Sequence, residues 1–254
     1  MIFLYICGRI PLERRRIMKV LVIIPCYNEE KSIVDTVTQL NKIKLKNDTL
    51  DYIVINDGST DNSKQVMIEN NINFIDLPFN LGIGGAVQTG YKYAYYNNYD
   101  IAIQFDGDGQ HNCNYIKDLV SEIKNGNNIV IGSRFVSNLS KFKSTRIRRV
   151  GINFLSFLIK IVSGTKIYDP TSGFRAVDKE IIELFAREYP IDYPEPDTIV
   201  TIIKKGYKVS EIPVEMNGRK HGKSSINPIK SVYYMIKVSL AIIIAGISTK
   251  KGRC

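Results

Sequence analysis

Several residue types are scarce in this 254-residue sequence, which has no tryptophan, two histidines and four cysteines. No C-x-x-C pair occurs, and no histidine at zinc-site spacing accompanies the cysteines, which are Cys7, Cys26, Cys113 and Cys254. This pattern argues against a zinc site and against a disulfide framework. It favours a reducing, cytosolic compartment.

Long apolar runs are also missing. The N-terminal run at 2–7 is too short for the core of a signal peptide, and its basic cluster follows the run instead of preceding it. A C-terminal run at 232–247 is shorter than the roughly twenty apolar residues of a spanning helix and contains Lys237. We expect this helix to lie in a membrane interface, and an internal core helix is the alternative.

Acidic residues are absent from two stretches, 123–168 and 216–254, whereas 20–122 is net negative. The whole chain nevertheless carries a formal net charge of +10. Basic segments of this kind typically face phosphate-bearing ligands, an anionic membrane surface or nucleic acid.

What is present is the composition of a folded protein, with 44% hydrophobic and 24% charged residues. Short apolar runs alternate with segments of helical spacing. Strands are predicted at 19–24, 52–55, 72–77, 101–105, 129–132 and 208–214, and helices near 33–43, 61–70, 84–97, 114–125, 144–163, 178–187, 196–205 and 226–247. This alternation predicts an α/β fold with a mainly parallel twisted sheet and helices on both faces.

Two local signals set the first boundaries. Pro25 is predicted to end the first strand, and Asn28 to cap the helix that follows. We expect residues 1–17 to be an N-terminal extension before a natural start at Met18. Residues 18–225 then form the main domain, and 226–254 form a membrane-associating helix with a basic tail.

The strongest chemical signal is the segment Asp106-Gly107-Asp108-Gly109-Gln110 after a buried strand. Ligands of such sheets bind beyond the carboxyl ends of the strands. Two carboxylates separated by one glycine can reach one cation, and hard oxygen ligands select Mg²⁺ or Mn²⁺. Such an ion would neutralise a diphosphate leaving group. The alternative is a plain Asp/Gly turn.

Two further turns follow strands. Asp57 is predicted to accept hydrogen bonds from a base or ribose, with an Asx-turn as the alternative, and Asp61 to cap the next helix. The glycine loop 80–86, which contains Gly84, opens a helix and could hold backbone N–H groups against an anion. It lacks the spacing of a dinucleotide fingerprint and of a P-loop, which disfavours an NAD enzyme and an NTPase.

Six motifs occur in a fixed order along the chain. They are IPCYNEE, INDGSTDNS, FNLGIGGAVQTGYKYA, DGDGQH, GSRF and DPTSGFRA. Together they resemble an inverting family-2 glycosyltransferase with the GT-A fold, from about residue 20 to residue 213. The resemblance is greatest to enzymes that load a sugar onto a polyprenyl or dolichyl phosphate.

This resemblance implies roles for particular residues. The nucleotide sugar would contact Pro25, Tyr27, Glu29, Asp57, Gly84 and Arg175, although a structural role for Arg175 is an open alternative. The metal would bind Asp106, Asp108 and Gln110. Arg134 of GSRF would hold the acceptor phosphate together with a later arginine. The candidates for this second arginine are Arg146, Arg148 and Arg149; the resemblance does not rank them, and we take Arg148 as the prediction.

Two acidic residues leave the chemical class of the acceptor undecided. Glu195 and Asp197 depart from the lipid-phosphate pattern and lie where hydroxyl-directed relatives carry a general base. A hydroxyl acceptor needs such a base, whereas a phosphate is already an anion and needs only positioning. The alternative is that these acids simply stabilise the first turn of a helix. The basic segment 219–223 is expected over the donor diphosphate or the acceptor, or else as a solvated face.

The sequence therefore predicts a membrane-surface glycosyltransferase on the cytoplasmic face of the cell membrane, acting in surface polysaccharide or cell-wall synthesis. Its partners would be a nucleotide diphosphate sugar, Mg²⁺ or Mn²⁺, a lipid-linked acceptor and anionic lipid. Polyprenyl phosphate is the expected acceptor, and a sugar hydroxyl of a lipid-linked polysaccharide is the alternative. A third hypothesis is an inactive nucleotide-binding scaffold. Nucleic acid is not expected, because a nucleic-acid binder would need aromatic residues interleaved with the basic ones over a groove, and it would leave the nucleotide-site motifs unexplained.

Overall fold

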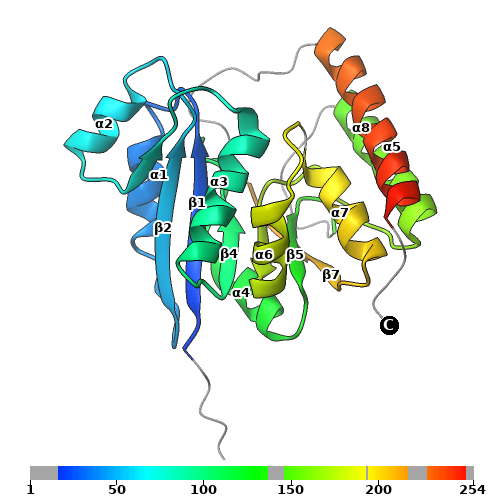
Figure 1. Cartoon of the computed structure of the whole chain (residues 1–254), viewed down its shortest axis with the longest axis horizontal. Helices are drawn as coiled ribbons and strands as arrows, with labels where there is room; N and C mark the ends of the chain where they lie inside the picture. Colours follow the sequence, from blue (N-terminus) through cyan, green and yellow to red (C-terminus); the bar gives the residue numbers. More distant parts are fainter. Residues whose placement is uncertain (1–16, 137–145, 193, 217–227, 250–254) are drawn as a thin grey trace, which may run out of the picture.

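The computed structural model describes residues 17–136, 146–192, 194–216 and 228–249. In this part of the chain one sheet has seven strands in the order β3-β2-β1-β4-β6-β5-β7 (Figure 1). The strands are β1 (Lys19–Cys26), β2 (Thr49–Asn56), β3 (Phe74–Asp76), β4 (Ile101–Gln104), β5 (Ile129–Ser133), β6 (Arg175–Asp178) and β7 (Val209–Pro213).

Helices cover both faces of the sheet. One face carries α1 (Ile33–Leu40), α2 (Ser63–Glu69), the 3₁₀ turn η1 (Cys113–Tyr115) and α4 (Ile116–Lys124). The other carries α3 (Gly82–Tyr96), α6 (Lys179–Arg187) and α7 (Pro194–Lys204), with α5 (Arg146–Ser163) and α8 (Pro228–Ser248) packed beyond α7. Each face has its own apolar core, because the central strands are buried on both sides.

The sheet is parallel except for β6, which pairs antiparallel with both β4 and β5. β1 lies between β2 and β4 and pairs parallel with both. The chain order therefore reverses beside β1, which creates the crevice where α/β sheets bind ligands. The predicted α/β fold with a mainly parallel sheet is confirmed.

The prediction for Pro25 is wrong. β1 continues through Pro25 to Cys26, and Pro25 is paired in register with Ile55 of β2. On the other side, the pairing of β1 with β4 extends only to Ile23. Pro25 therefore stands where one side of the strand has no ladder hydrogen bond to lose.

Asn28 does not cap α1, contrary to our expectation. Its backbone adopts a left-handed conformation with φ 57°. Its side-chain oxygen accepts hydrogen bonds from the backbone N–H groups of Thr60 (2.8 Å) and Asp61 (3.3 Å). Asn28 thus joins the loop after β1 to the loop after β2. Asp61 accepts from the N–H of Ser63 at the start of α2 (2.9 Å), although the N-cap residue of this helix is Asn62 and not Asp61 as predicted.

The C-terminal helix has two different faces. Val238, Ile242 and Ala245 of α8 are buried in the core, and Gly246 packs against Val162 of α5. Figure 1 shows α5 and α8 side by side at the edge of the molecule. Both helices also present exposed apolar side chains, which we call the apolar stripes. They are Val150, Phe154, Phe157 and Ile161 on α5 and Tyr233, Ile236, Leu240, Ile243, Ile244 and Ile247 on α8.

Within the described ranges, no helix combines the length and the apolar character that crossing a membrane requires. The strand β6 was not predicted, whereas the other strands lie where the apolar runs placed them. The basic segment 219–223 lies outside the described residues, as does all of the predicted extension except Ile17. The predicted domain boundaries stay predictions.

Candidate active site

The predicted site residues gather where strands β1, β2, β4 and β5 end. Asn56 ends β2 and is followed by Asp57, and Ser133 ends β5 and is followed by Arg134. Asp106 comes two residues after the end of β4. The residue between them, Phe105, donates its backbone N–H to the carbonyl of Ile23 (2.9 Å) and so continues the pairing with β1. Because these strands are parallel, the loops after them lie at one edge of the sheet.

The carboxylates of Asp106 and Asp108 have different partners. His111 Nε2 lies 2.9 Å from Asp106 Oδ2, and the Asp106 side chain keeps 39% of its surface exposed. Asp108 Oδ1 accepts from the backbone N–H of Gln110 (3.0 Å). Thr36 Oγ1 donates to the carbonyl of Gly107 between them (3.2 Å), which ties this loop to α1.

Asp106 is held in its charged form by its surroundings. Burial by itself would raise the pKa of this carboxyl group. The nearby His111, through charge and hydrogen bond, and the charges of Arg134 and Arg175 outweigh that effect and lower the pKa below its usual value. Asp106 is therefore an anion near neutral pH, as a metal ligand must be.

The donor set suits a hard divalent cation. Asp106, Asp108 and Gln110 offer only oxygen ligands, which Mg²⁺ and Mn²⁺ prefer. Within the described ranges, no cluster of three or more His, Cys, Asp or Glu residues forms a complete metal cage. A site with two carboxylates instead leaves coordination positions for phosphate oxygens, which is the usual arrangement for nucleotide-bound Mg²⁺.

Gly173 closes one side of the Asp106 carboxylate. A Cβ atom on Gly173 would lie 3.1 Å from Asp106 Oδ1 and 3.2 Å from Oδ2. It would also lie 3.1 Å from Nε2 of Gln104, a buried side chain whose Nε2 has no hydrogen-bond partner among the described residues. The absence of a side chain at residue 173 thus lets the loop before β6 approach Asp106 closely.

The end of β1 and the loop after it carry three predicted nucleotide contacts. Pro25 is buried at the end of β1, and Tyr27 is 48% exposed. Glu29 is half-buried, and its Oε2 accepts from Ser32 Oγ at 2.5 Å. Tyr27 therefore offers an open aromatic surface beside the two fixed residues.

Asp57 holds the start of α3. Its Oδ1 accepts from the backbone N–H of Leu81 (2.7 Å), and its carbonyl accepts from the side-chain amide of Asn80 (3.0 Å). Burial raises the pKa of Asp57, and hydrogen bonds from Leu81 and Gly82 partly offset that rise. The carboxylate thus connects the loop after β2 to the glycine loop, so one of its oxygens is used within the protein.

Gly84 has a packing role in place of the expected ligand contact. Its N–H donates to the carbonyl of Ile191 (3.1 Å). A Cβ atom at Gly84 would lie 2.1 Å from that oxygen and 2.2 Å from the carbonyl oxygen of Pro190. Only glycine fits here, and its N–H is occupied by the protein, so it is not available to an anion.

Arg134 is buried in an ion pair. Its Nε and Nη2 lie 2.7 Å from the two carboxylate oxygens of Asp169, and Nη2 also donates to Thr171 Oγ1 (3.0 Å). Glu211 on β7 accepts from the N–H groups of Tyr168 (2.7 Å) and Asp169 (2.9 Å). The GSRF and DPTSGF segments are therefore joined in one network, and the charge of Arg134 also acts on Asp106.

The arginines at the start of α5 differ in exposure. Arg148 is exposed, whereas Arg149 is half-buried and its guanidinium carbon lies 3.8 Å from the ring centroid of Phe135. Phe135 directly follows Arg134. This cation–π contact places the Arg149 guanidinium beside the GSRF segment, a position that the sequence alone did not predict.

Arg175 is fully buried and bound by backbone oxygens. Its guanidinium donates to the carbonyl of Ser172 (2.7 and 3.2 Å), the carbonyl of Glu195 (3.3 Å) and Thr198 Oγ1 (3.2 Å). These contacts support the structural alternative that the sequence left open. Arg175 secures the start of α7 to the DPTSGF segment.

Glu195 and Asp197 lie in the first turn of α7 and are half-buried. Burial raises the pKa of both carboxyl groups, and for Glu195 the charge of Arg175 opposes this rise while that of Asp106 adds to it. Glu195 is thus electrostatically coupled to the predicted metal site. The preceding Tyr193 lies outside the described residues.

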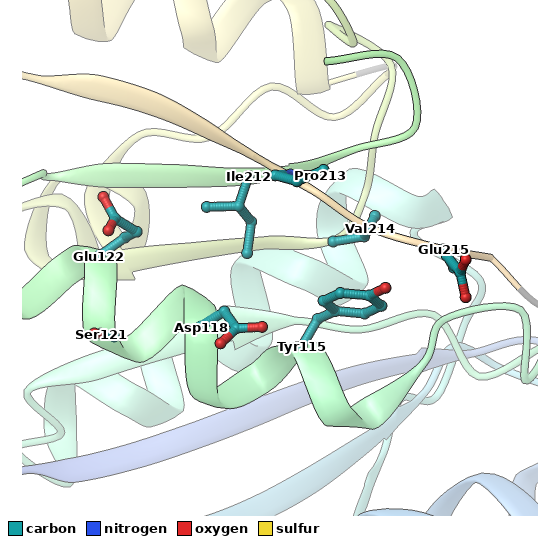
Figure 2. A pocket seen from close by; sticks show the side chains of 8 residues that line it. All are labelled: Tyr115, Asp118, Ser121, Glu122, Ile212, Pro213, Val214 and Glu215. Atoms are coloured by element: carbon teal, nitrogen blue, oxygen red, sulfur yellow. The ribbon is translucent and has the colours of Figure 1, made fainter. Parts of the chain in front are cut away.

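A pocket of about 350 Å³ lies elsewhere, between α4 and β7 (Figure 2). Asp118, Glu122 and Glu215 supply its carboxylates, and Tyr115, Ile212 and Val214 supply much of its apolar lining. None of the predicted site residues lines it. It is therefore separate from the nucleotide and metal loops.

Sequence reasoning missed His111. Its ring is buried, stacks on Phe174 with centroids 4.9 Å apart and meets Phe105 edge-on at 5.4 Å. It ends the DGDGQH motif of the sequence, but no role was assigned to it there. A lone histidine at that place is equally compatible with a surface loop, so its contact with Asp106 needed the fold.

Comparison with known proteins gives a consistent result. The family model for glycosyl transferase family 2 matches residues 21–185. The UDP-N-acetylglucosamine–dolichyl-phosphate N-acetylglucosaminyltransferase of Methanococcus voltae is 32% identical over 215 residues, covering 76% of this chain and 84% of that protein. The undecaprenyl-phosphate mannosyltransferase of Micrococcus luteus is 26% identical over 219 residues, covering 83% and 88% respectively.

Solved structures share the fold. The glucosyl-3-phosphoglycerate synthase of Mycobacterium tuberculosis, in complex with Mn²⁺, UDP-glucose and phosphoglyceric acid, superposes with a TM-score of 0.68. The alignment covers 90% of this chain and 79% of that chain, at 16% identity. At that identity the similarity establishes the GT-A type of architecture only.

Proposed function

The chain belongs to glycosyl transferase family 2 and is a glycosyltransferase, and we propose that it transfers a sugar from a nucleotide diphosphate sugar to a polyprenyl phosphate. The observation that carries this proposal is the similarity, over most of both chains, to proteins named as dolichyl- and undecaprenyl-phosphate sugar transferases. The segregated basic segments and the oxygen-ligand loop support it.

In the proposed reaction an oxygen of the acceptor phosphate attacks the anomeric carbon, with inversion. The bond from that carbon to the donor diphosphate breaks, and the nucleoside diphosphate leaves with the bonding electrons. The acceptor is an anion at neutral pH, so positioning is the main requirement and no general base is needed.

Asp106, Asp108 and Gln110 would hold Mg²⁺ or Mn²⁺. When bound, the cation neutralises charge on the diphosphate leaving group. The loop that carries these residues is fixed by the contacts of Thr36 and His111 described above. Structural relatives crystallised with Mn²⁺ or Mg²⁺ and UDP support the use of a divalent cation without choosing between the two.

For the acceptor phosphate, we propose Arg134 together with the arginines at the start of α5. Arg134 is oriented by Asp169 and belongs to the GSRF segment at the carboxyl end of β5. Arg148 is exposed at the start of α5, and Arg149 lies over Phe135. The contact of Arg149 with Phe135, which directly follows Arg134, supports Arg149 as the later arginine beside the predicted Arg148.

A sugar hydroxyl is the second acceptor that an observation favours. Burial raises the pKa of Glu195 and Asp197, which moves each carboxylate toward the range of an effective general base. Replacing each acid by its amide, in separate variants, distinguishes the two acceptors. A loss of roughly 100-fold in kcat for either variant supports a base and hence a hydroxyl acceptor, because general base catalysis contributes about that much or more.

We further propose that the enzyme acts at the cytoplasmic face of a membrane, held there by the exposed apolar stripes of α5 and α8. Interfacial binding combines buried apolar area with attraction of basic residues to anionic lipid, at about 1 kcal/mol per residue. Both helices lie within the acid-free stretches of the sequence.

The proposed function is tested with purified protein, polyprenyl phosphate in anionic vesicles, Mg²⁺ or Mn²⁺ and a panel of radiolabelled nucleotide sugars. One donor should transfer its label to the organic phase, and only when polyprenyl phosphate and the cation are both present. Label in the organic phase without added polyprenyl phosphate, or no transfer with any donor, contradicts the proposal.

A further inference from the structure

His111 is in direct contact with the metal-site loop. Its side chain is 3% exposed, and its Nε2 lies 2.9 Å from Asp106 Oδ2. A charged carboxylate can only accept hydrogen bonds, so Nε2 must carry the hydrogen. The contact is thus an N–H donated to one oxygen of Asp106.

The imidazole has little freedom to turn away. Its ring stacks on Phe174 at 4.9 Å with an interplanar angle of 30° and meets Phe105 at 5.4 Å and 62°. Phe105 and Phe174 themselves meet edge to face at 5.4 Å. The backbone of His111 forms an antiparallel bridge with Met216, beyond the end of β7. The two ring contacts and the backbone bridge therefore restrict the imidazole to one orientation, in which Nε2–H points at Asp106.

The Asp106 carboxylate is confined in turn. His111 binds its Oδ2, and Gly173 approaches both oxygens so closely that a Cβ atom would lie 3.1 Å from Oδ1 and 3.2 Å from Oδ2. A freely rotating carboxylate would lose conformational entropy on binding a cation. A carboxylate already held by an N–H donor binds with less of that cost.

We propose that His111 is a positioning residue for the metal site, which holds Asp106 through Nε2–H so that the carboxylate is oriented before the cation and nucleotide arrive. This inference rests on the proposed role of Asp106 as a metal ligand. Residues that hydrogen-bond to a metal-coordinating side chain without touching the metal typically change metal affinity by about 10–100-fold when they are replaced.

Two substitutions separate the hydrogen bond from the packing. In His111→Gln the amide nitrogen stands as many bonds from the backbone as Nε2 does, so it can still donate to Asp106. In His111→Phe the ring can keep its contacts with Phe105 and Phe174, but the donor is lost. A purely structural role predicts that phenylalanine is the better replacement, and a positioning role predicts glutamine.

The measurement is a Mn²⁺ titration of the full chain followed by electron paramagnetic resonance, with circular dichroism as the check of folding. We expect wild type and His111→Gln to bind Mn²⁺ within about threefold of each other and His111→Phe to bind roughly 10–100-fold more weakly. A folded His111→Phe variant that binds Mn²⁺ as well as wild type overturns the proposal.

A second measurement does not depend on metal or on a substitution of His111. Long-range ¹H–¹⁵N correlation spectra of metal-free wild type report which ring nitrogen carries hydrogen, and His221→Gln assigns the signals because the chain has only two histidines. A protonated Nε2 of His111 is expected, and an unprotonated Nε2 overturns the proposal. If wild type shows the protonated Nε2 but binds no Mn²⁺, the metal role of Asp106 fails, and with it the inference that His111 serves a metal site.

Discussion

Arg134 and Asp169 form a buried bidentate ion pair, in which Nε and Nη2 of the arginine each lie 2.7 Å from one carboxylate oxygen. The two side chains are 5% and 0% exposed, so neither charge is compensated by bulk water. This pair joins the strand β5 to the DPTSGF segment and orients the arginine that we place at the acceptor phosphate. Its removal should therefore affect both stability and turnover.

Asp169→Ala should lower the free energy of unfolding by about 3–5 kcal/mol, because it removes the bidentate carboxylate partner of a buried charge. Urea denaturation measures the change. The control is Asp192→Ala, whose ion pair with Lys237 is solvent-exposed and is expected to contribute about 0–1 kcal/mol. Equal midpoints for wild type and Asp169→Ala would show that the pair does not stabilise the fold.

Asp108→Asn should abolish metal-dependent turnover and leave the fold intact. The amide oxygen can still accept from the N–H of Gln110, but the charge that binds the cation is lost. Kinetics at increasing Mg²⁺ or Mn²⁺ measure the effect, and Asp118→Asn, an exposed acid of α4, is the control expected to keep its activity. Turnover of Asp108→Asn at the wild-type rate would refute the metal assignment.

Gly173→Ala should reduce turnover with a modest effect on stability. The added methyl group would lie 3.1 Å from both Asp106 Oδ1 and Gln104 Nε2, so the carboxylate must shift by a few tenths of an ångström. Misplacement on this scale is costly for catalysis, and we expect a loss of about tenfold or more. Gly151→Ala on α5, where the nearest atom is Met235 Sδ at 3.3 Å, is the matched control. If Gly173→Ala keeps the same kcat as Gly151→Ala, the close contact between residue 173 and the Asp106 carboxylate does not matter for catalysis, and the prediction is wrong.

Charge on the apolar stripes should release the protein from membranes. Phe157→Asp on α5 and Ile244→Asp on α8 replace side chains that are 61% exposed, so folding should be little affected. Flotation with anionic vesicles should show binding weaker by about 10–100-fold for each, since burying one such side chain contributes about 1.5–3 kcal/mol. Ile68→Asp, at an exposed residue of α2, is the control. Binding unchanged in both stripe variants would eliminate this surface as the docking face.

The periodicity of the sequence predicted most of the fold because buried parallel strands appear as short apolar runs. β6 escaped prediction because it is only Arg175–Asp178, with a charged residue at each end. The burial of Arg175 becomes acceptable through the carbonyls of Ser172 and Glu195 and the hydroxyl of Thr198, and the last two residues belong to α7, about twenty residues further along the chain. Such compensation is not visible in a local pattern.

The candidate site was predictable in outline and not in detail. Asp106 and Asp108 could be proposed as metal ligands from the sequence, because two acids after a buried strand offer oxygen ligands at the edge of the sheet where ligands bind. The role of Gly84 depends on Ile191, and the role of His111 depends on its contacts with Asp106 and Phe174. These contacts join segments brought together by the sheet, so they could be recognised only in the folded chain.

The chemical nature of the product tests the central claim most directly. Product made from polyprenyl phosphate, the active labelled nucleotide sugar and Mg²⁺ or Mn²⁺ is treated with mild acid, and the released label is analysed. We predict that the acid releases free sugar quantitatively, because the sugar is joined to a phosphate through its anomeric carbon. Label that stays in an acid-stable product would contradict transfer to a polyprenyl phosphate.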